Sequence, residues 1–443
     1  MRITEVKKEK YERSCITACC KLMRRKKMKS WQRLILLLAV VLTLSWITVV
    51  QAADIVIGFT GPLSGPAAEY GQDCVNGLDM AIKDLNAAGG VTIEGQKLLF
   101  RLEKLDDKVD PNQAIKNARQ LLAQNALAIY NPVFSTQAAL MKVNQEECNE
   151  FILMGYTSSP KATQTGNKLL VVMTAPFTVS TQLYADWAWE RGWRKAAMVV
   201  TLGSYGDEWR EAFKTYWKKI GGTITADKPA NYYTKTDYTA PLAAALATNP
   251  DVMLIGGPSS TTALVIEQSR NMGYKGGFML VDQAKMDSIA QMLEGTSLME
   301  NTIGTSITAS SPAPASPAFD KKYKEIYKRV TTSEVVIHYI TLYSLAKAIQ
   351  AANTVDDVYA IRAAFPKAFP LLSDKFPSEI HGISSAGRVY MPASVQSIKN
   401  GKFSKPEMYI WWTKTQADFD KIQKITKSTV PIKWFKSKMG TIE

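Results

Sequence analysis

Several apolar runs of the chain are followed directly by hydroxyl groups, aromatic rings or a carboxylate. The run at 126–130 leads to Ser135 and Thr136, where a helix is expected to begin. Hydroxyls beside the free N–H groups and positive dipole of a helix start suit a carboxylate or another oxygen anion. Asp282 follows the run at 278–281 and has the negative charge that an ammonium group needs. The full set of candidate ligand-binding residues is Ser64, Tyr70, Phe134, Ser135, Thr136, Tyr156, Thr157, Ser158, Tyr205, Gly257, Pro258 and Asp282.

Each of these signals also has a simpler structural explanation. A Ser or Thr at a helix start commonly caps the free N–H groups, and Asp282 is equally suited to cap the turn after its strand. Both explanations stay open for any one loop. Three hydroxyl-bearing loops at equivalent strand ends, at 131–136, 155–160 and 202–206, are harder to explain by capping alone.

The sequence contains no arrangement of residues that is typical of a catalyst. There are two histidines, and His338 lies among apolar neighbours on an expected helix, which favours a structural role. Neither a nucleophile elbow, a phosphate-binding loop nor a metal-ligand cluster is present. Asp106 and Asp107 end a polar strand and are interpreted as a solvated turn. We therefore expect no enzyme activity, no cofactor and no metal ion.

Strand-like and helix-like segments alternate along the chain from residue 55 onward. Buried-strand runs at 55–59, 126–130 and 252–255 are separated by helical patterns, one of which begins at Pro111. This alternation predicts the α/β class, with two doubly wound parallel-sheet lobes. Ligands bind such sheets at the carboxyl ends of the strands, where the candidate loops lie. Late strands at 388–391 and 394–398 are also expected, with Asn400-Gly401 as a hairpin turn.

The net charge of +14 is concentrated at the N-terminus. Residues 1–52 hold 12 Lys and Arg against 3 Asp and Glu, a net of 12 − 3 = +9, which leaves +5 for the rest. This distribution argues against a nucleic-acid partner. The Lys-rich end at 421–438 is interpreted as a solvated tail, and the five Trp residues at 187–217 as packing residues rather than a stacking site.

A basic segment, the apolar run at 34–50 and a small-residue exit predict a signal peptide over residues 1–52, cleaved after Ala52 or Ala53. The alternative is a retained membrane anchor. Cleavage would leave two cysteines, Cys74 and Cys148, for which a disulfide and free buried thiols both remain open, with free thiols favoured.

Several stretches resemble the branched-chain amino-acid-binding family of type I periplasmic binding proteins, the extracytoplasmic components of ABC importers. They are, in order, DIVIGFTGPLSGPAAEYGQDCVNGLDMAIKDLNAAGG, LDDKVDPNQAIKNARQLL, NPVFSTQ, TSSPKAT, SYGDEW and GGPSSTTALVIEQSRNMGYKG. The resemblance implies lobes built from discontinuous chain and joined by three crossings. Lobe I is expected over 54–174 plus 303–390, and lobe II over 175–302 plus 391–443.

The resemblance also assigns roles to individual residues. Ser135 matches a serine that holds the ligand's carboxylate, Tyr156 and Ser158 match the loop that holds the amino-acid head group, and Asp282 matches an acid that pairs with the ammonium group. Tyr70 and Tyr205 match pocket aromatics from the two lobes. Phe134 and Tyr156 are bulkier than the family's usual residues, which argues against an aliphatic amino acid as the ligand.

The function implied is that of a periplasmic, monomeric solute-binding protein that delivers an amino-acid-like molecule to the membrane permease of an ABC transporter. Ligand contacts from both lobes would favour the closed state, since only there does one molecule touch both. Two alternatives remain: the ligand-binding component of a sensory system, and a binder of an amide or an aromatic carboxylate.

Overall fold

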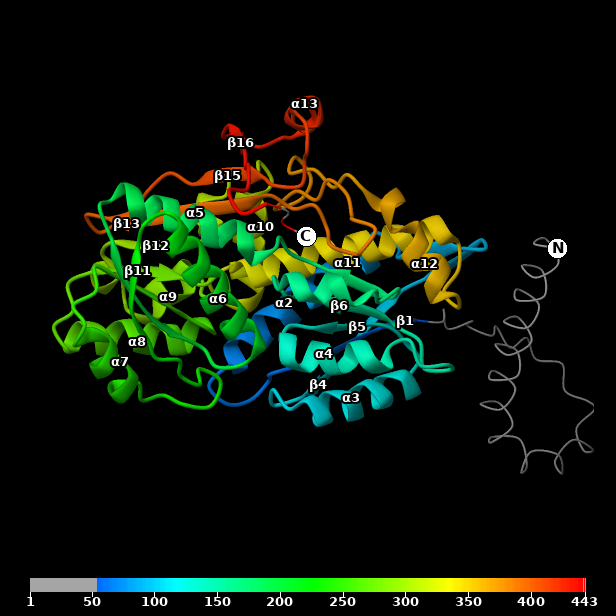
Figure 1. Ribbon diagram of the computed structural model, residues 1–443. Coiled ribbons are helices and arrows are strands. Elements are labelled where there is room, and N and C mark those ends of the chain that lie inside the picture. Colours follow the sequence, from blue (N-terminus) through cyan, green and yellow to red (C-terminus); the bar gives the residue numbers. More distant parts are fainter. Residues whose placement is uncertain (1–53, 441, 443) are drawn as a thin grey trace, which may run out of the picture.

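The computed structural model describes residues 54–440 and 442 (Figure 1). The predicted signal peptide, its cleavage site and the alternative membrane anchor lie outside the described residues. One described helix, α11 (Ser333–Ala352), is long and apolar enough to cross a membrane. Because 72% of its apolar window is buried inside the protein, α11 is a core helix.

The first sheet is entirely parallel and has the order β4-β1-β5-β6-β7. Its central strands are apolar on both faces because helices cover both faces. The helices α2 and α11 pack on one face, while α3 and α4 pack on the other. The elements are β1 (Ile55–Gly61), α2 (Ala68–Ala87), β4 (Phe100–Asp106), α3 (Pro111–Ala123), β5 (Ala126–Asn131), α4 (Phe134–Val143), β6 (Ile152–Gly155) and β7 (Leu170–Val172).

The second sheet has the order β16-β15-β13-β12-β11-β10-β8-β9. It is parallel from β9 to β12 and turns antiparallel at β13. The helices α5 and α6 cover one face, and α7, α8 and α9 cover the other. The elements are α5 (Phe177–Glu190), β8 (Lys195–Val200), α6 (Ser204–Lys219), β9 (Thr223–Asp227), α7 (Thr239–Leu246), β10 (Val252–Gly256), α8 (Ser259–Asn271), β11 (Gly277–Leu280), α9 (Met286–Met292), β12 (Thr302–Gly304), β13 (Ala393–Lys399), β15 (Glu407–Ile410) and β16 (Ile432–Trp434).

The chain passes between the two sheets at three places: between β7 and α5, between β12 and the helix α10 (Ser316–Tyr327), and just before β13. Each sheet with its helices therefore forms one lobe made of discontinuous chain, and Figure 1 shows the early blue and cyan elements beside the yellow α11. The expected fold class, two doubly wound lobes, is confirmed. The expected boundary at 302/303 falls inside β12, which pairs with the second sheet.

The remaining elements are small and lie at the edges of the two lobes. They are the hairpin β2 (Val91–Ile93) and β3 (Gln96–Leu98), α12 (Val358–Ala364), β14 (Lys402–Phe403) and α13 (Gln416–Ile425).

The predicted turn at Asn400-Gly401 is confirmed. Both residues have positive φ, 53° and 68°, which suits the two central positions of a tight hairpin. The turn joins β13 to β14, with Lys399 paired to Lys402. The strand predicted at 388–391 is wrong, because Arg388 and Val389 form only isolated bridges. The side chain of Arg388 is fully buried and bonds to backbone carbonyls of another segment.

The structure corrects two further expectations. Asp107 is not a solvated turn residue but is fully buried, accepting hydrogen bonds from the backbone N–H of Val109 (2.9 Å) and from Asn131 (3.3 Å). Burial raises the pKa of Asp107 to about 6. The Lys-rich end is only partly a solvated tail, because β16 within it pairs with β15.

The tryptophan expectation agrees with the structure. The expectation of free buried thiols holds for Cys74 and is wrong for Cys148, which is exposed and disulfide-bonded. Cys74 is a free, buried thiol, so it does not pair with Cys148. Trp209 and Trp217 are fully buried, and Trp189 packs edge-on against Trp217. These rings build the core of the second lobe.

Glu379 ties the C-terminal segment to the first lobe. Its carboxylate accepts hydrogen bonds from His381 (2.8 Å), Thr426 (2.6 Å) and the backbone N–H of Lys427 (2.7 Å), as well as from Ser373. Burial by itself would raise the pKa of Glu379, but these hydrogen bonds outweigh it and lower the pKa to about 2.

We expect Glu379→Gln to reduce the free energy of unfolding at pH 7 by about 3 kcal/mol, the value of a shift of this size. Because the folded-state pKa is depressed, the stabilisation is complete above the unfolded pKa and is lost as pH falls toward 2. Urea unfolding of both proteins between pH 7 and pH 2.5 measures this difference. The exposed Glu190→Gln serves as the control, and a difference that does not shrink in acid contradicts the assignment.

Candidate functional site

The carboxyl ends of the parallel strands from the two lobes face one another across a cleft. Hydrogen bonds join the lobes directly along its rim: Ser260 Oγ donates to the carbonyl of Pro66 (2.8 Å), and Ser288 Oγ donates to Glu69 (2.8 Å). Glu208 of α6 also accepts a hydrogen bond from Ser159. The structure is therefore in a closed arrangement.

Seven of the predicted site residues line one cavity of about 30 Å³ in this cleft. They come from both lobes and from loops far apart in the chain: Tyr70, Phe134, Tyr156, Thr157, Ser158, Tyr205 and Asp282. The aromatic rings narrow the space, since Tyr70 stacks on Tyr156 with ring centroids 6.1 Å apart. Tyr70 is fixed by a hydrogen bond from its hydroxyl to the carbonyl of Pro132 (2.8 Å).

The other predicted residues lie outside this cavity. Ser64 is exposed and donates to Asp106 (2.5 Å). The hydroxyl of Thr136 is turned toward the segment between β5 and α4, where it lies 3.0 Å from the side-chain oxygen of Asn131 and from the carbonyl of Val133 and donates to one of them. Ser135, Gly257 and Pro258 stand at the starts of α4 and α8 without lining the cavity.

Four cavity residues were not singled out from the sequence: Pro132, Thr174, Tyr233 and Gln283. Tyr233 lies in an irregular segment after β9, where no apolar run precedes it. Its hydroxyl and the side chain of Gln283 bond to each other (3.0 Å). Gln283 could have been predicted from the sequence, because it directly follows Asp282.

Asp282 is held in a fixed orientation by two donors from α6. Its Oδ1 accepts hydrogen bonds from the hydroxyl of Tyr205 (2.5 Å) and from the indole N–H of Trp209 (2.8 Å). Trp209 is fully buried and stacks on Phe177, with ring centroids 5.2 Å apart. Within the described chain, Oδ2 of Asp282 has no hydrogen-bond partner, so one carboxylate oxygen remains for a ligand in the cleft.

The loop opposite Asp282 is supported from behind by Arg388. This guanidinium is fully buried and donates to the carbonyls of Ser159 (2.7 Å), Thr174 (2.9 Å) and Thr157 (3.3 Å). It thereby places a positive charge beneath the loop that carries Ser158. The hydroxyl of Ser158 is buried, lines the cavity and has no partner among the described residues. A buried hydroxyl needs a hydrogen-bond partner, and a ligand group in the cleft is one that would reach it.

A buried ion pair joins the lobes behind the cleft. Lys285 and Glu334 are 6% and 2% exposed, and their Nζ and Oε1 atoms are 3.5 Å apart. Oε1 of Glu334 also accepts a hydrogen bond from the hydroxyl of Tyr156 (3.3 Å). Burial raises the pKa of Glu334, and the nearby charge of Lys285 opposes this increase.

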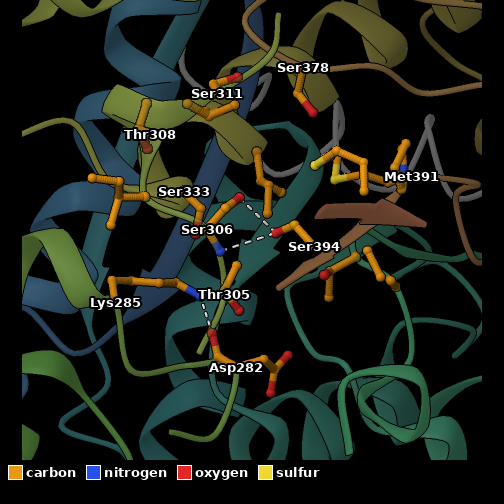
Figure 2. A pocket seen from close by; sticks show the side chains of 18 of the residues that line it. Asp282, Lys285, Thr305, Ser306, Thr308, Ser311, Ser333, Ser378, Met391 and Ser394 are labelled. Atoms are coloured by element: carbon orange, nitrogen blue, oxygen red, sulfur yellow. Dashed lines mark hydrogen bonds between the residues drawn. The ribbon is translucent and has the colours of Figure 1, made fainter. Parts of the chain in front are cut away.

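A second cavity of about 130 Å³, here called the hinge cavity, lies beside the cleft (Figure 2). Its walls include all three chain crossings, represented by Thr174, Thr305 and Met391. Tyr156, Thr174 and Asp282 line both cavities, which makes the two spaces neighbours.

Neither histidine is placed for catalysis. His338 is fully buried, its Nδ1 lies 2.7 Å from the carbonyl of Glu334, and burial lowers its pKa to about 4. His381 belongs to the cluster around Glu379. Over residues 54–440 and 442, no group of three or more His, Cys, Asp or Glu residues is suited to hold a metal ion.

The fold and this cleft define a two-lobed α/β protein that encloses a small molecule between its lobes. Residues 54–402 match the family model of periplasmic binding proteins, and the chain belongs to that family. Members of this family bind ligands without transforming them, so the protein is not an enzyme. The resemblance to the branched-chain amino-acid-binding family is confirmed.

Among similar proteins, an amino acid binding protein of Pseudomonas aeruginosa is 24% identical over 327 residues, which cover 72% of this chain and 84% of that protein. A branched-chain amino acid transporter substrate-binding protein of Streptococcus pneumoniae, solved with isoleucine, has a TM-score of 0.67 at 19% identity and covers 80% of this chain and 99% of its own. An ABC transporter solute-binding protein of R. palustris, solved with benzoate, has a TM-score of 0.68 at 15% identity and covers 80% and 95%. At these identities the two structures show the fold alone.

We expect Lys285→Met to weaken closure, because it leaves the carboxylate of Glu334 buried without its partner. Breaking a buried pair in this way costs about 3–5 kcal/mol. Small-angle X-ray scattering should show a larger radius of gyration for Lys285→Met than for the unaltered protein. Lys347→Met on the exposed side of α11 is the matched control, and equal scattering from both variants would count against an interlobe role for the pair.

Proposed function

We propose that this protein is the extracytoplasmic binding component of an ABC importer and that it closes its lobes around an amino-acid-like ligand. The observation that carries the proposal is the pair of unmatched polar groups on opposite walls of the cleft. Ser158 from the first lobe presents a hydroxyl and Asp282 from the second presents Oδ2. A zwitterionic head group has a carboxylate for one wall and an ammonium for the other.

The charges around the cleft agree with this orientation of the head group. Arg388 lies behind the loop of Ser158 and favours a ligand carboxylate there. Asp282 has no basic side chain bonded to its carboxylate, since its two donors are the neutral Tyr205 and Trp209. A ligand ammonium would therefore supply the missing positive charge.

The lobes, the partners and the location follow from the same proposal. Lobe I comprises 54–174 plus 305–390, and lobe II comprises 175–304 plus 391–440, so that β12 (Thr302–Gly304) stays intact in lobe II. The protein works as a monomer in the periplasm and delivers its ligand to a membrane permease. Ser135, Thr136, Ser64, Gly257 and Pro258 do not line the cleft cavity in this closed arrangement.

An aromatic carboxylate is a second candidate ligand. The stacked rings of Tyr70 and Tyr156 suit a flat molecule, and the relative from R. palustris was solved with benzoate. Asp282 weighs against it, because a ligand with a carboxylate and no cation would add to the negative charge of the cleft. A sensory function would differ from import only in the partner protein that recognises the closed form.

Thermal-shift measurements against amino acids, amides and aromatic carboxylates test the ligand class, since a ligand raises the apparent stability by mass action. For an amino acid that binds, we expect Asp282→Ala to weaken the affinity by about 1.5–3 kcal/mol, the scale of a hydrogen bond to a charged group. Calorimetry measures the loss, with Asp374→Ala on the exposed surface as the control. Equal affinities for the unaltered protein and Asp282→Ala would remove Asp282 from the site, and stabilisation by benzoate alone would favour the second candidate.

The periplasmic location predicts that the mature protein begins at Ala53 or Asp54. N-terminal sequencing of the protein recovered from the periplasmic fraction checks this expectation. Recovery of the chain in the membrane fraction with its first 52 residues intact would instead indicate a retained anchor.

A further inference from the structure

The cleft cavity and the hinge cavity differ in what they can accommodate. The cleft cavity, at about 30 Å³, is the smaller of the two and is narrowed by aromatic rings. The hinge cavity is about 130 Å³ and begins at the same three residues, Tyr156, Thr174 and Asp282. A molecule whose head group lies at Asp282 therefore extends most readily into the hinge cavity.

Hydroxyl groups from several separate segments converge on the hinge cavity. Ser306, in the crossing after β12, and Ser394, near the start of β13, bond to each other (2.8 Å), as Figure 2 shows. The oxygen of Ser333, at the start of α11, is buried and has no hydrogen-bond partner within the described part of the chain. Thr305, Ser311 and Ser378 also line this space. The wall is mixed, because Ile307, Val336 and Met391 also line it. Thr305 already bonds to Tyr184, and Ser306 bonds to Ser394. Ser333 therefore carries the buried hydroxyl that an apolar ligand group would leave unmatched.

The charges on this wall are already compensated. Lys285 is the only basic residue that lines the hinge cavity among the described residues, and its ammonium group faces Glu334 and the carbonyl of Asp282. Once a ligand ammonium lies against the carboxylate of Asp282, no charge on the wall is left without a partner of opposite sign. A further charge on the ligand would be buried without compensation.

We propose that the hinge cavity is the subsite for the side chain of the ligand and that it selects an uncharged hydrogen-bonding group, a carboxamide or a hydroxyl. This inference rests on the proposed function, because it takes the amino-acid head group to lie in the cleft. The ligand class is then an amino acid with a neutral polar side chain, rather than a branched aliphatic one or an acidic one.

Three amino acids of nearly equal shape test this selection on the mature, unaltered protein. The side chains of asparagine, leucine and aspartate branch at the same carbon, but the first ends in an amide, the second is aliphatic and the third is charged. Glutamine and glutamate repeat the comparison of amide with acid on a side chain that is one methylene longer. We expect calorimetry to show the amides binding at least about 10-fold tighter than leucine or the acids, the scale of leaving buried polar groups unpaired.

Two variants locate the selection in the hinge cavity. Ser378→Leu fills part of the space, and Ser333→Ala removes the unpartnered hydroxyl; both should reduce the preference for amide over leucine at least about 5-fold. Ser385→Leu, in an exposed turn, is the matched control for an added leucine. Circular dichroism checks that each variant is folded. If Ser378→Leu does not fold, Ser333→Ala and the ligand series still test the proposal.

The outcomes separate this inference from the proposed function. If leucine binds as tightly as the amides, and Asp282→Ala weakens its binding, the subsite proposal is wrong but the proposed function is not. An amide preference that Ser333→Ala and Ser378→Leu do not change also overturns the subsite. Failure of every amino acid to stabilise the protein overturns both.

Discussion

Closing two polar lobes over one another removes charged and hydroxyl groups from water, and each of these groups needs a partner in the closed state. Lys285 of the second lobe and Glu334 of the first meet this requirement, with the hydroxyl of Tyr156 as a further donor. A buried ion pair adds little stability compared with an apolar contact, but separating its two charges while they remain buried costs several kcal/mol. The pair therefore selects one relative position of the lobes. The cleft residues face one another only in that position.

The residues that touch the cleft are supported by others that never reach it. Trp209 holds the carboxylate of Asp282 from inside the second lobe, and Arg388 holds the carbonyls of the opposite loop from inside the first. Both supports are fully buried, and both come from segments distant in the chain from the groups they hold. Buried side chains therefore fix the positions of the cleft residues, while the polar groups of the cleft remain available for a ligand.

The chain crossings have two roles in this architecture. They connect the lobes, and residues within them, Thr174, Thr305 and Met391, form walls of the hinge cavity. A change in the angle between the lobes therefore alters the cavity walls as well as the cleft. A ligand that fits the cavity only in the closed form would shift the population toward that form, which links its identity to closure.

Sequence patterns were enough to predict the fold class, the alternation of strands and helices, the hairpin at Asn400-Gly401 and the loops from which the cleft is built. These features follow from local periodicity, turn chemistry and a resemblance to a known family, all of which are readable within short segments. The same patterns did not predict the buried positions of Arg388 and Asp107, the strand β16 in the Lys-rich end or the place of Tyr233 in the cleft. Burial and the pairing of polar groups depend on partners tens to hundreds of residues away, and no local pattern specifies those partners.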